Sequence, residues 1–174
     1  MIRPARREDA DAIAGLWNPI IRDTDITFNP VEKTPLEVAA LIAERHTADL
    51  AFLVAEQDCE ILGFAGYAQF RGGQGYARTM EHSVNLVPGA RGKGLGRALM
   101  RALEDHAIAR SRRTLIGAIT ATNLASLDFH CRLGFAEVGR IAQAGWKFGR
   151  YHDLVFMQKL LDPPDGQGQQ AALD

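Results

Sequence analysis

The segment that decides the fold reads Val84-Asn85-Leu86-Val87-Pro88-Gly89-Ala90-Arg91-Gly92-Lys93-Gly94-Leu95-Gly96-Arg97. It joins a predicted strand over residues 79–87 to a predicted amphipathic helix over residues 94–110. Glycines let backbone N–H groups approach a ligand closely, and a helix N-terminus supplies unpaired N–H donors at the positive end of the helix dipole. The turn between the two elements therefore predicts a binding site for a phosphate or pyrophosphate group.

Two familiar phosphate-binding motifs do not fit this segment. A P-loop needs Ser or Thr directly after its lysine, but Gly94 follows Lys93. A dinucleotide-binding turn needs G-x-G-x-x-G early in a βαβ unit, which differs from the glycine spacing found here. The remaining pattern is R-x-x-G-x-G, formed by Arg91, Gly94 and Gly96. A glycine-rich connection with solvated charges is the alternative that needs no ligand.

Hydrophobic periodicity and turn residues predict the other elements. Strands are expected over residues 2–5, 51–56, 61–70, 79–87, 114–119, 135–141 and 154–160, and helices over residues 8–21, 35–46, 94–110 and 123–133. The 35–46 helix is expected to bury Leu36, Ala39, Ala40 and Ala43. Without an internal repeat or a long linker, the order predicts one α/β domain with a mixed sheet over residues 1–161, followed by a disordered tail over residues 162–174.

Composition and charge exclude several classes of protein. The 174 residues carry 20 Lys and Arg against 21 Asp and Glu, a formal net charge of -1, which predicts no general attraction to nucleic acid or to an anionic membrane. A basic cluster at Arg110, Arg112 and Arg113 is the only support for a nucleic-acid partner. Cys59 and Cys131 lack the spacing of a metal site, so no metal is expected. No signal-peptide pattern or membrane-length apolar run is found, and the sequence predicts a cytoplasmic protein.

More motifs surround the glycine-rich turn in a fixed order. They are Glu81-His82-Ser83-Val84, Asn123-Leu124-Ala125-Ser126, His130-Cys131-Arg132-Leu133-Gly134-Phe135, Gly145-Trp146-Lys147-Phe148-Gly149-Arg150 and Phe156-Met157-Gln158. Over residues 2–160 this order resembles the phosphinothricin and methionine sulfone (sulfoximine) acetyltransferase branch of the GNAT superfamily. The resemblance implies an α/β (α+β) fold whose mixed, mostly antiparallel sheet splits into a V and is flanked by about four helices. It also implies acetyl-CoA as co-substrate and a homodimer.

The resemblance assigns the cofactor-binding residues. The backbone of Val84, Asn85 and Leu86 is expected to pair with the pantetheine arm. The pyrophosphate is expected on the turn, formed by Arg91, Gly92, Lys93, Gly94, Leu95, Gly96 and Arg97. Asn123, the predicted N-cap of the following helix, matches a position that contacts the cofactor in the family.

Amide formation from a thioester needs a base for the attacking ammonium and an acid for the leaving thiolate. Glu81 is predicted as a catalytic residue, because burial would raise its pKa; a solvent-facing or paired glutamate is the alternative. His130 stands where many superfamily members carry a tyrosine proton donor, and a histidine at the core edge is the alternative. Which of the two is the base stays open. Cys131 points about 100° away from His130 on a helix, so we expect direct transfer rather than an acyl-cysteine.

The predicted acceptor site is less well defined, because the sequence departs from the branch near it, for example at Arg71-Gly72 where Arg-Pro is usual. Its residues are Phe28, Arg71, Tyr76, Arg78, Glu81, His82 and Ser83. An arginine there could bind an amino-acid carboxylate bidentately; a solvated loop charge is the alternative. Strand alternation places His82 on the face opposite Glu81, where it would pack or form a hydrogen bond beneath it.

These residues predict an N-acetyltransferase that moves an acetyl group from acetyl-CoA to the primary amine of a small amino acid or analogue. Phosphinothricin, methionine sulfone and methionine sulfoximine are the expected types of acceptor. The alternatives are a protein N-terminal or polyamine acetyltransferase, or a non-catalytic acyl-CoA-binding module. Such a module could lose Glu81 and His130, and both are present here.

Overall fold

A computed structural model describes residues 1–161 of the chain, and the predicted tail over 162–174 lies outside the described residues. The strands are β1 (Ile2–Pro4), β2 (Phe52–Gln57), β3 (Glu60–Gln69), β4 (Thr79–Leu86), β5 (Thr114–Thr120), β6 (Ala136–Lys147) and β7 (Arg150–Leu160). The helices are α1 (Ala10–Asp23), α2 (Pro35–Thr47), α3 (Leu95–Ala109) and α4 (Leu124–Arg132), with short 3-10 turns at Arg7–Asp9, Gln74–Tyr76 and Pro88–Ala90. This order of elements is the predicted one.

The strands form one seven-stranded sheet in the order β1-β2-β3-β4-β5-β7-β6. All neighbouring pairs are antiparallel except β4 and β5, which are parallel and are connected through α3. Parallel neighbours need such a crossover connection. The predicted mixed, mostly antiparallel sheet with four helices is therefore confirmed.

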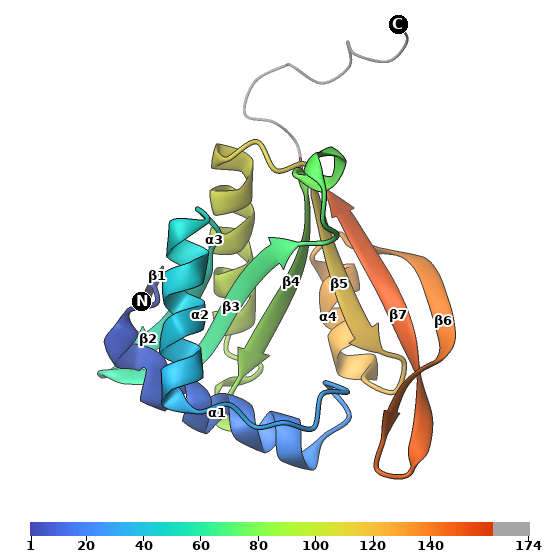
Figure 1. The fold of residues 1–174 in the computed structure, drawn as a ribbon, viewed down its shortest axis with the longest axis horizontal. Coiled ribbons are helices and arrows are strands. Elements are labelled where there is room, and N and C mark those ends of the chain that lie inside the picture. The colour runs from blue at the N-terminus through green and yellow to red at the C-terminus, as the bar shows by residue number, and fades with distance from the viewer. Residues whose placement is uncertain (162–174) are drawn as a thin grey trace, which may run out of the picture.

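Helices cover both faces of the sheet (Figure 1). Alternation along β2 sends Phe52 and Val54 towards α1 and α2, and sends Leu53 and Ala55 towards α3. The cluster against α3 is the larger of the two and continues across β5 and β7. β2 and β3 are thus buried on both faces, whereas β4 is buried on its α3 face and exposes Glu81 and Ser83 on the other.

The parallel pair β4 and β5 separates along its length. Pairing runs only from Thr79 opposite Thr114 to His82 opposite Gly117, although β4 continues to Leu86 and β5 to Thr120. Figure 1 shows the two strands diverging beyond this point. The sheet is therefore split into a V whose vertex lies at His82 and Gly117, as the resemblance implies.

The structure corrects the predicted buried face of α2. Val38 and Ile42, one turn apart, are the buried residues of this helix, whereas Leu36 is 73% exposed. Of the other predicted residues, Ala39 is only partly buried, and Ala40 and Ala43 are exposed. The i, i+4 row with branched side chains faces α1 and β2, because it fills more of the core than a row of alanines.

The last hairpin is longer than predicted at both strands. The pairing of β6 with β7 shifts between Ile141 and Gly145, where Gln143 adopts a positive φ of 53° and its N–H donates to Asp153 Oδ1 at 2.8 Å. This bulge interrupts the alternation of apolar residues, and most of β6 is exposed as the edge strand. The predicted ends at Ile141 and Leu154 were therefore wrong, and the hairpin turn lies at Phe148-Gly149.

Candidate active site

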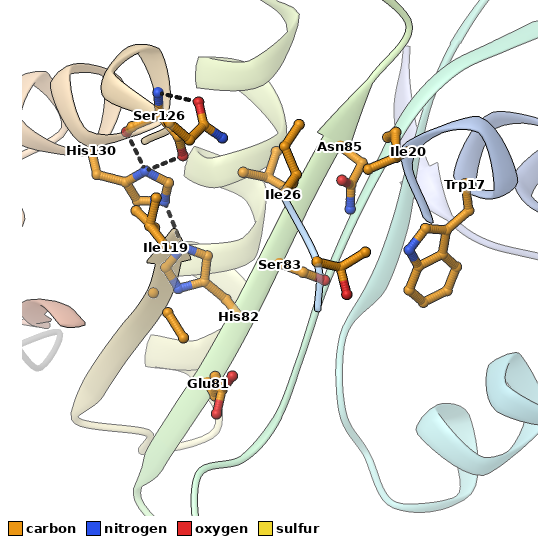
Figure 2. Close-up of a pocket in the computed structure, with 15 residues that line it drawn as sticks. Trp17, Ile20, Ile26, Glu81, His82, Ser83, Asn85, Ile119, Ser126 and His130 are labelled. Carbon is orange, nitrogen blue, oxygen red and sulfur yellow. Dashed lines mark hydrogen bonds between the residues drawn. The ribbon is translucent and has the colours of Figure 1, made fainter. Parts of the chain in front are cut away.

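A cavity of about 200 Å³ opens where β4 and β5 separate. Figure 2 shows β4 crossing it, with α1 on one side and α4 on the other. The residues that line it are Trp17, Ile20, Ile26, Thr27, Glu81, His82, Ser83, Val84, Asn85, Gly117, Ala118, Ile119, Asn123, Ser126 and His130. The predicted catalytic residues Glu81 and His130 are therefore brought together in one cavity.

Glu81 lies in the middle of β4 and lines two cavities at once. The second cavity, of about 290 Å³, lies on the α1 and α2 side and includes Trp17, Arg45 and Gln69. The next two residues along β4, His82 and Ser83, also line both cavities. Partial desolvation in this position raises the pKa of the Glu81 carboxyl. A carboxylate with a raised pKa between two cavities can accept a proton from an amine held in either.

His82 points to the opposite side of β4 and meets His130 of α4, as Figure 2 shows. The two Nε2 atoms are 3.0 Å apart, and His130 Nδ1 lies 2.7 Å from the carbonyl oxygen of Ser126. Both rings are buried, at 7% and 3% exposure. Of the two predicted possibilities for His82, packing or a hydrogen bond beneath Glu81, the structure shows a hydrogen bond, and its partner is the predicted catalytic residue His130.

The partners of the two rings determine where the protons lie. The Ser126 carbonyl can only accept, so His130 carries its proton on Nδ1 and its Nε2 accepts from His82 Nε2–H. His82 Nδ1 then has no hydrogen-bond partner in the described chain. Burial lowers the pKa of both imidazoles, and the neighbouring ring lowers that of His82 further. The pair is therefore neutral, and both nitrogens of His130 are engaged.

The glycine-rich turn leads into α3 with the backbone geometry predicted for an anion site. Gly92 and Gly94 have positive φ angles of 74° and 84°, and a Cβ at either would meet open space. Gly94 is the N-cap of α3 and provides no side-chain cap, so the first N–H groups of the helix keep no partner among residues 1–161. Lys93 and Arg97 are exposed beside them. These groups fit a pyrophosphate, with backbone donors and two cationic side chains at one helix end.

Gly96 has a different role from the other two glycines of the turn. It is buried, and a Cβ there would lie 3.2 Å from Leu86 Cδ1 and 3.3 Å from Phe129 Cζ. It therefore lets α3 approach β4 and α4 closely. Leu86, predicted to contact the cofactor, has its side chain in this packing rather than in the cavity.

Val84, Asn85 and Asn123 line the cavity as predicted for the cofactor side. Asn123 is also the N-cap of α4, and its side-chain oxygen accepts from Ser126 N–H at 3.2 Å, so the predicted cap is confirmed. On β4, Val84 and Asn85 lie beyond the last pair with β5, so the edge of β4 that faces β5 is free of strand pairing there.

Most of the acceptor residues predicted from sequence lie outside the two cavities. Neither cavity is lined by Phe28, Arg71, Tyr76 or Arg78, and the last three are exposed. Their acceptor role stays a prediction. Instead, α1 and the segment after it provide Trp17, Ile20, Ile26 and Thr27. Helical spacing predicts Trp17 and Ile20 on the apolar face of α1, but it cannot distinguish a core residue from one that lines a cavity.

No group of three or more His, Cys, Asp or Glu side chains within residues 1–161 could hold a metal ion. None of the helices described here combines the length and the hydropathy needed to cross a bilayer.

Comparison with known proteins identifies the family. Residues 17–135 match the model of the acetyltransferase (GNAT) family. The L-methionine sulfoximine/L-methionine sulfone acetyltransferase of Pseudomonas aeruginosa is 39% identical over 166 residues, covering 93% of this chain and 95% of the relative.

Two solved structures share the fold. Ribosomal-protein-alanine N-acetyltransferase from Brucella melitensis has a TM-score of 0.90 at 35% identity and covers 92% of this chain and 99% of its own. The protein yncA from Salmonella typhimurium, solved with its cofactor acetyl-CoA, has a TM-score of 0.90 at 32% identity and covers 99% and 98%. With the split sheet, the glycine-rich turn and the carboxylate at the vertex, these matches show that the chain belongs to the GNAT family of acetyltransferases.

Proposed function

We propose that this enzyme transfers the acetyl group of acetyl-CoA to the primary amine of a small amino acid or analogue, of the methionine sulfone, methionine sulfoximine or phosphinothricin type. The observation that carries the proposal is the position of Glu81, which lines both the cavity at the split of the sheet and the cavity on the α1 and α2 side. An acceptor held in either cavity would have its amine at the same carboxylate as a donor bound along the split of the sheet. Full-length similarity to an acetyltransferase for methionine derivatives supports this type of acceptor.

Different residues of the chain would bind the cofactor and accept the proton. Acetyl-CoA, when bound, supplies the thioester. The N-terminus of α3, with Lys93 and Arg97, would hold the pyrophosphate, and the free edge of β4 at Val84 and Asn85 would pair with the amides of the arm. Glu81 would take the proton from the acceptor ammonium. Its pKa is raised towards neutral pH, which makes the carboxylate a stronger base.

His130 is the second proposed catalytic residue, and its geometry supports it less directly. It lines the cavity, but one ring nitrogen donates to the Ser126 carbonyl and the other accepts from His82. Proton transfer through His130 would require one of these hydrogen bonds to open. The proposal therefore depends on Glu81 as the base.

Direct transfer in a ternary complex is supported by the surroundings of Cys131. Its side chain does not line either cavity, and the imidazole of the adjacent His130 is engaged elsewhere. A cysteine nucleophile needs a base within hydrogen-bond reach, which this residue lacks within the described chain. The two free, exposed cysteines also support the proposed cytoplasmic location, where thiols stay reduced.

A homodimer is part of the same proposal. Three aromatic residues at the end of the last hairpin, Trp146, Phe148 and Tyr151, are 57–60% exposed, and the rings of Trp146 and Tyr151 are 4.7 Å apart. Exposed aromatic clusters of this kind are typical of protein interfaces.

The decisive experiment measures the release of the CoA thiol from acetyl-CoA with a panel of amines. The panel contains methionine sulfone, methionine sulfoximine, phosphinothricin, free amino acids, polyamines and short peptides that begin with alanine. We expect amine-dependent release with one or more of the amino-acid analogues. Release with peptides or polyamines alone would replace the proposed acceptor by one of the alternatives. No release with any amine, while acetyl-CoA binds, would favour a binding module.

A further inference from the structure

Lys147, the last residue of β6 before the hairpin turn, has a buried charge. The Lys147 side chain is 5% exposed, and its ammonium donates to the carbonyl oxygens of Thr24 and Thr27, each at 2.7 Å, and to that of Ile21. All three of its donors are therefore used. Within residues 1–161, no carboxylate lies within ion-pair distance of this ammonium. Burial lowers the pKa of Lys147, an effect that the charge of Asp25 partly offsets, and the three carbonyl dipoles stabilise the buried ammonium.

The three carbonyls lie at the end of α1 and in the loop after it, where backbone oxygens lack the hydrogen-bond donors of a continuing helix. Ile21 lies in the last turn of α1, where helix carbonyls lack intrahelical donors, and Thr24 and Thr27 follow in the loop. A cation is favourable at this negative end of the helix dipole. Lys147 thus acts as a C-terminal cap for α1 that is supplied from β6, 120 or more residues away in sequence.

Three more contacts, all made by Asp25, join the same loop to the hairpin and to the turn that follows β5. The Thr122 hydroxyl donates to Asp25 Oδ2 at 2.9 Å, and the same carboxylate lies 3.6 Å from Arg150 and 3.5 Å from His152 Nδ1. The other nitrogen of the His152 ring donates to the Lys147 carbonyl at 3.0 Å. Lys147 and Asp25 are therefore connected through one buried imidazole.

Phe28 completes the attachment by packing on the hairpin. Its ring lies so close to Gly145 that a Cβ there would be 2.1 Å from Phe28 Cδ2, and its centroid is 5.7 Å from that of His152. The absence of a side chain at Gly145 is therefore required for the ring to sit where it does.

The attached loop forms one wall of the cavity. Ile26 and Thr27 line it between the carbonyls held by Lys147, and Ile20 lines it from α1 (Figure 2 labels Ile20 and Ile26). The same loop reaches the β5 side of the cavity, because Asp25 accepts from the hydroxyl of Thr122, which is next to Asn123. Whatever moves the hairpin turn therefore moves this wall of the cavity.

We propose that Lys147 is a positioning residue for the acceptor: its ammonium fixes residues 24–28 against the hairpin and so sets the shape of the acceptor pocket. This inference rests on the proposed transfer to a small amine and assigns to the hairpin turn the control of acceptor affinity. Lys147 lines neither cavity, so it would act through the loop that it holds.

The test compares steady-state kinetics of Lys147→Met with those of the unaltered enzyme. We expect the KM for the acceptor to rise about tenfold, because the pocket wall loses its position, while kcat and the KM for acetyl-CoA change by less than about threefold. Lys147→Arg, which keeps a cation with several donors, is expected to recover part of the acceptor affinity. Lys159→Met is the matched control, since it removes a lysine that pairs with Glu104 at 2.8 Å outside the site.

Hydrogen exchange provides a measurement that does not need activity. Amides of residues 24–28 are expected to exchange faster in Lys147→Met than in the unaltered protein, and to be unchanged in Lys159→Met. Should Lys147→Met fail to fold, Asp25→Asn weakens the same attachment at a partly exposed position and is expected to raise the acceptor KM in the same way. Unchanged exchange in the loop, or KM values for acceptor and acetyl-CoA that rise together, would overturn the inference. Absence of transfer in the unaltered enzyme would instead refute the proposed function. Hydrogen exchange would then still test whether Lys147 holds residues 24–28 against the hairpin.

Discussion

Glu81 combines two properties at the scale of a single residue. It is a carboxylate on a strand whose two neighbours in sequence are buried, and it faces the space between two cavities. The sequence could predict its identity from the motif around it and its side of the strand from alternation. The second cavity could not be predicted, because only the fold brings Leu41 and Arg45 of α2 and Gln69 of β3 beside Glu81.

Replacing Glu81 by Gln removes the base and keeps the shape of the side chain. We expect kcat to fall by about 10²- to 10⁴-fold, with the KM for acetyl-CoA little changed. In the unaltered enzyme, kcat/KM for the acceptor is expected to rise with pH as Glu81 loses its proton, at a pH above the ordinary glutamate range because its pKa is raised. A pH–rate profile of both proteins measures this. An unchanged profile in the Glu81→Gln variant would contradict a role as base.

His82 and His130 illustrate what a sequence cannot predict at this scale. The opposite orientations of Glu81 and His82 follow from strand alternation and were predicted correctly. The contact between the two histidines, 48 residues apart, depends on where α4 lies against the vertex of the V. Gly117 contributes to it, since a Cβ there would lie 3.2 Å from the His82 ring.

The buried neutral pair predicts a loss of stability in acid. Both histidines have folded-state pKa values below their unfolded value, so the unfolded chain binds more protons as the pH falls below about 6.5. Each is expected to lower the free energy of unfolding by about 1.4 kcal/mol per pH unit in that range. Denaturant unfolding of the unaltered protein and of His82→Gln between pH 7 and pH 5 measures the difference in slope. Equal slopes would show that His82 is charged in the folded protein.

At the scale of elements, the turn between β4 and α3 was the most predictable part of the chain. Its glycines, charges and flanking periodicity all indicate the same structure. The face of α2 and the ends of β6 and β7 were predicted less well. Their placement depends on tertiary packing at Val38 and Ile42 and on the bulge at Gln143, and neither leaves a regular pattern in the sequence.

The left-handed conformation of Gly94 at the start of α3 can be tested by Gly94→Ala. A Cβ at φ 84° is strained, so we expect the free energy of unfolding to fall by about 1 kcal/mol and the affinity for acetyl-CoA to weaken, because the helix N–H groups shift. Gly89→Ala is the control, as a Cβ there meets open space and its φ is not positive. Calorimetry and thermal unfolding measure both effects. Equal affinities in the two variants would remove this turn from the cofactor site.

At the scale of the whole molecule, the exposed aromatic residues on the last hairpin predict self-association. We expect sedimentation to give a dimer mass for the unaltered protein and a monomer mass for Trp146→Glu combined with Tyr151→Glu, because charges desolvated in an interface are unfavourable. Leu36→Glu is the control, since Leu36 is 73% exposed on α2. A monomer mass before any substitution would exclude the dimer.

The split between β4 and β5 has a consequence for how the protein responds to its surroundings. Beyond His82 the backbone of β4 has no pairing with β5, and in the proposed complex the amides of the acetyl-CoA arm would form hydrogen bonds with this free edge. By mass action, a ligand present at 100 times its Kd adds about 2.7 kcal/mol to the folded state. If the arm binds there as proposed, the stability of the enzyme would depend on the supply of its cofactor, and the folded state would be least stable when CoA and acetyl-CoA are both scarce.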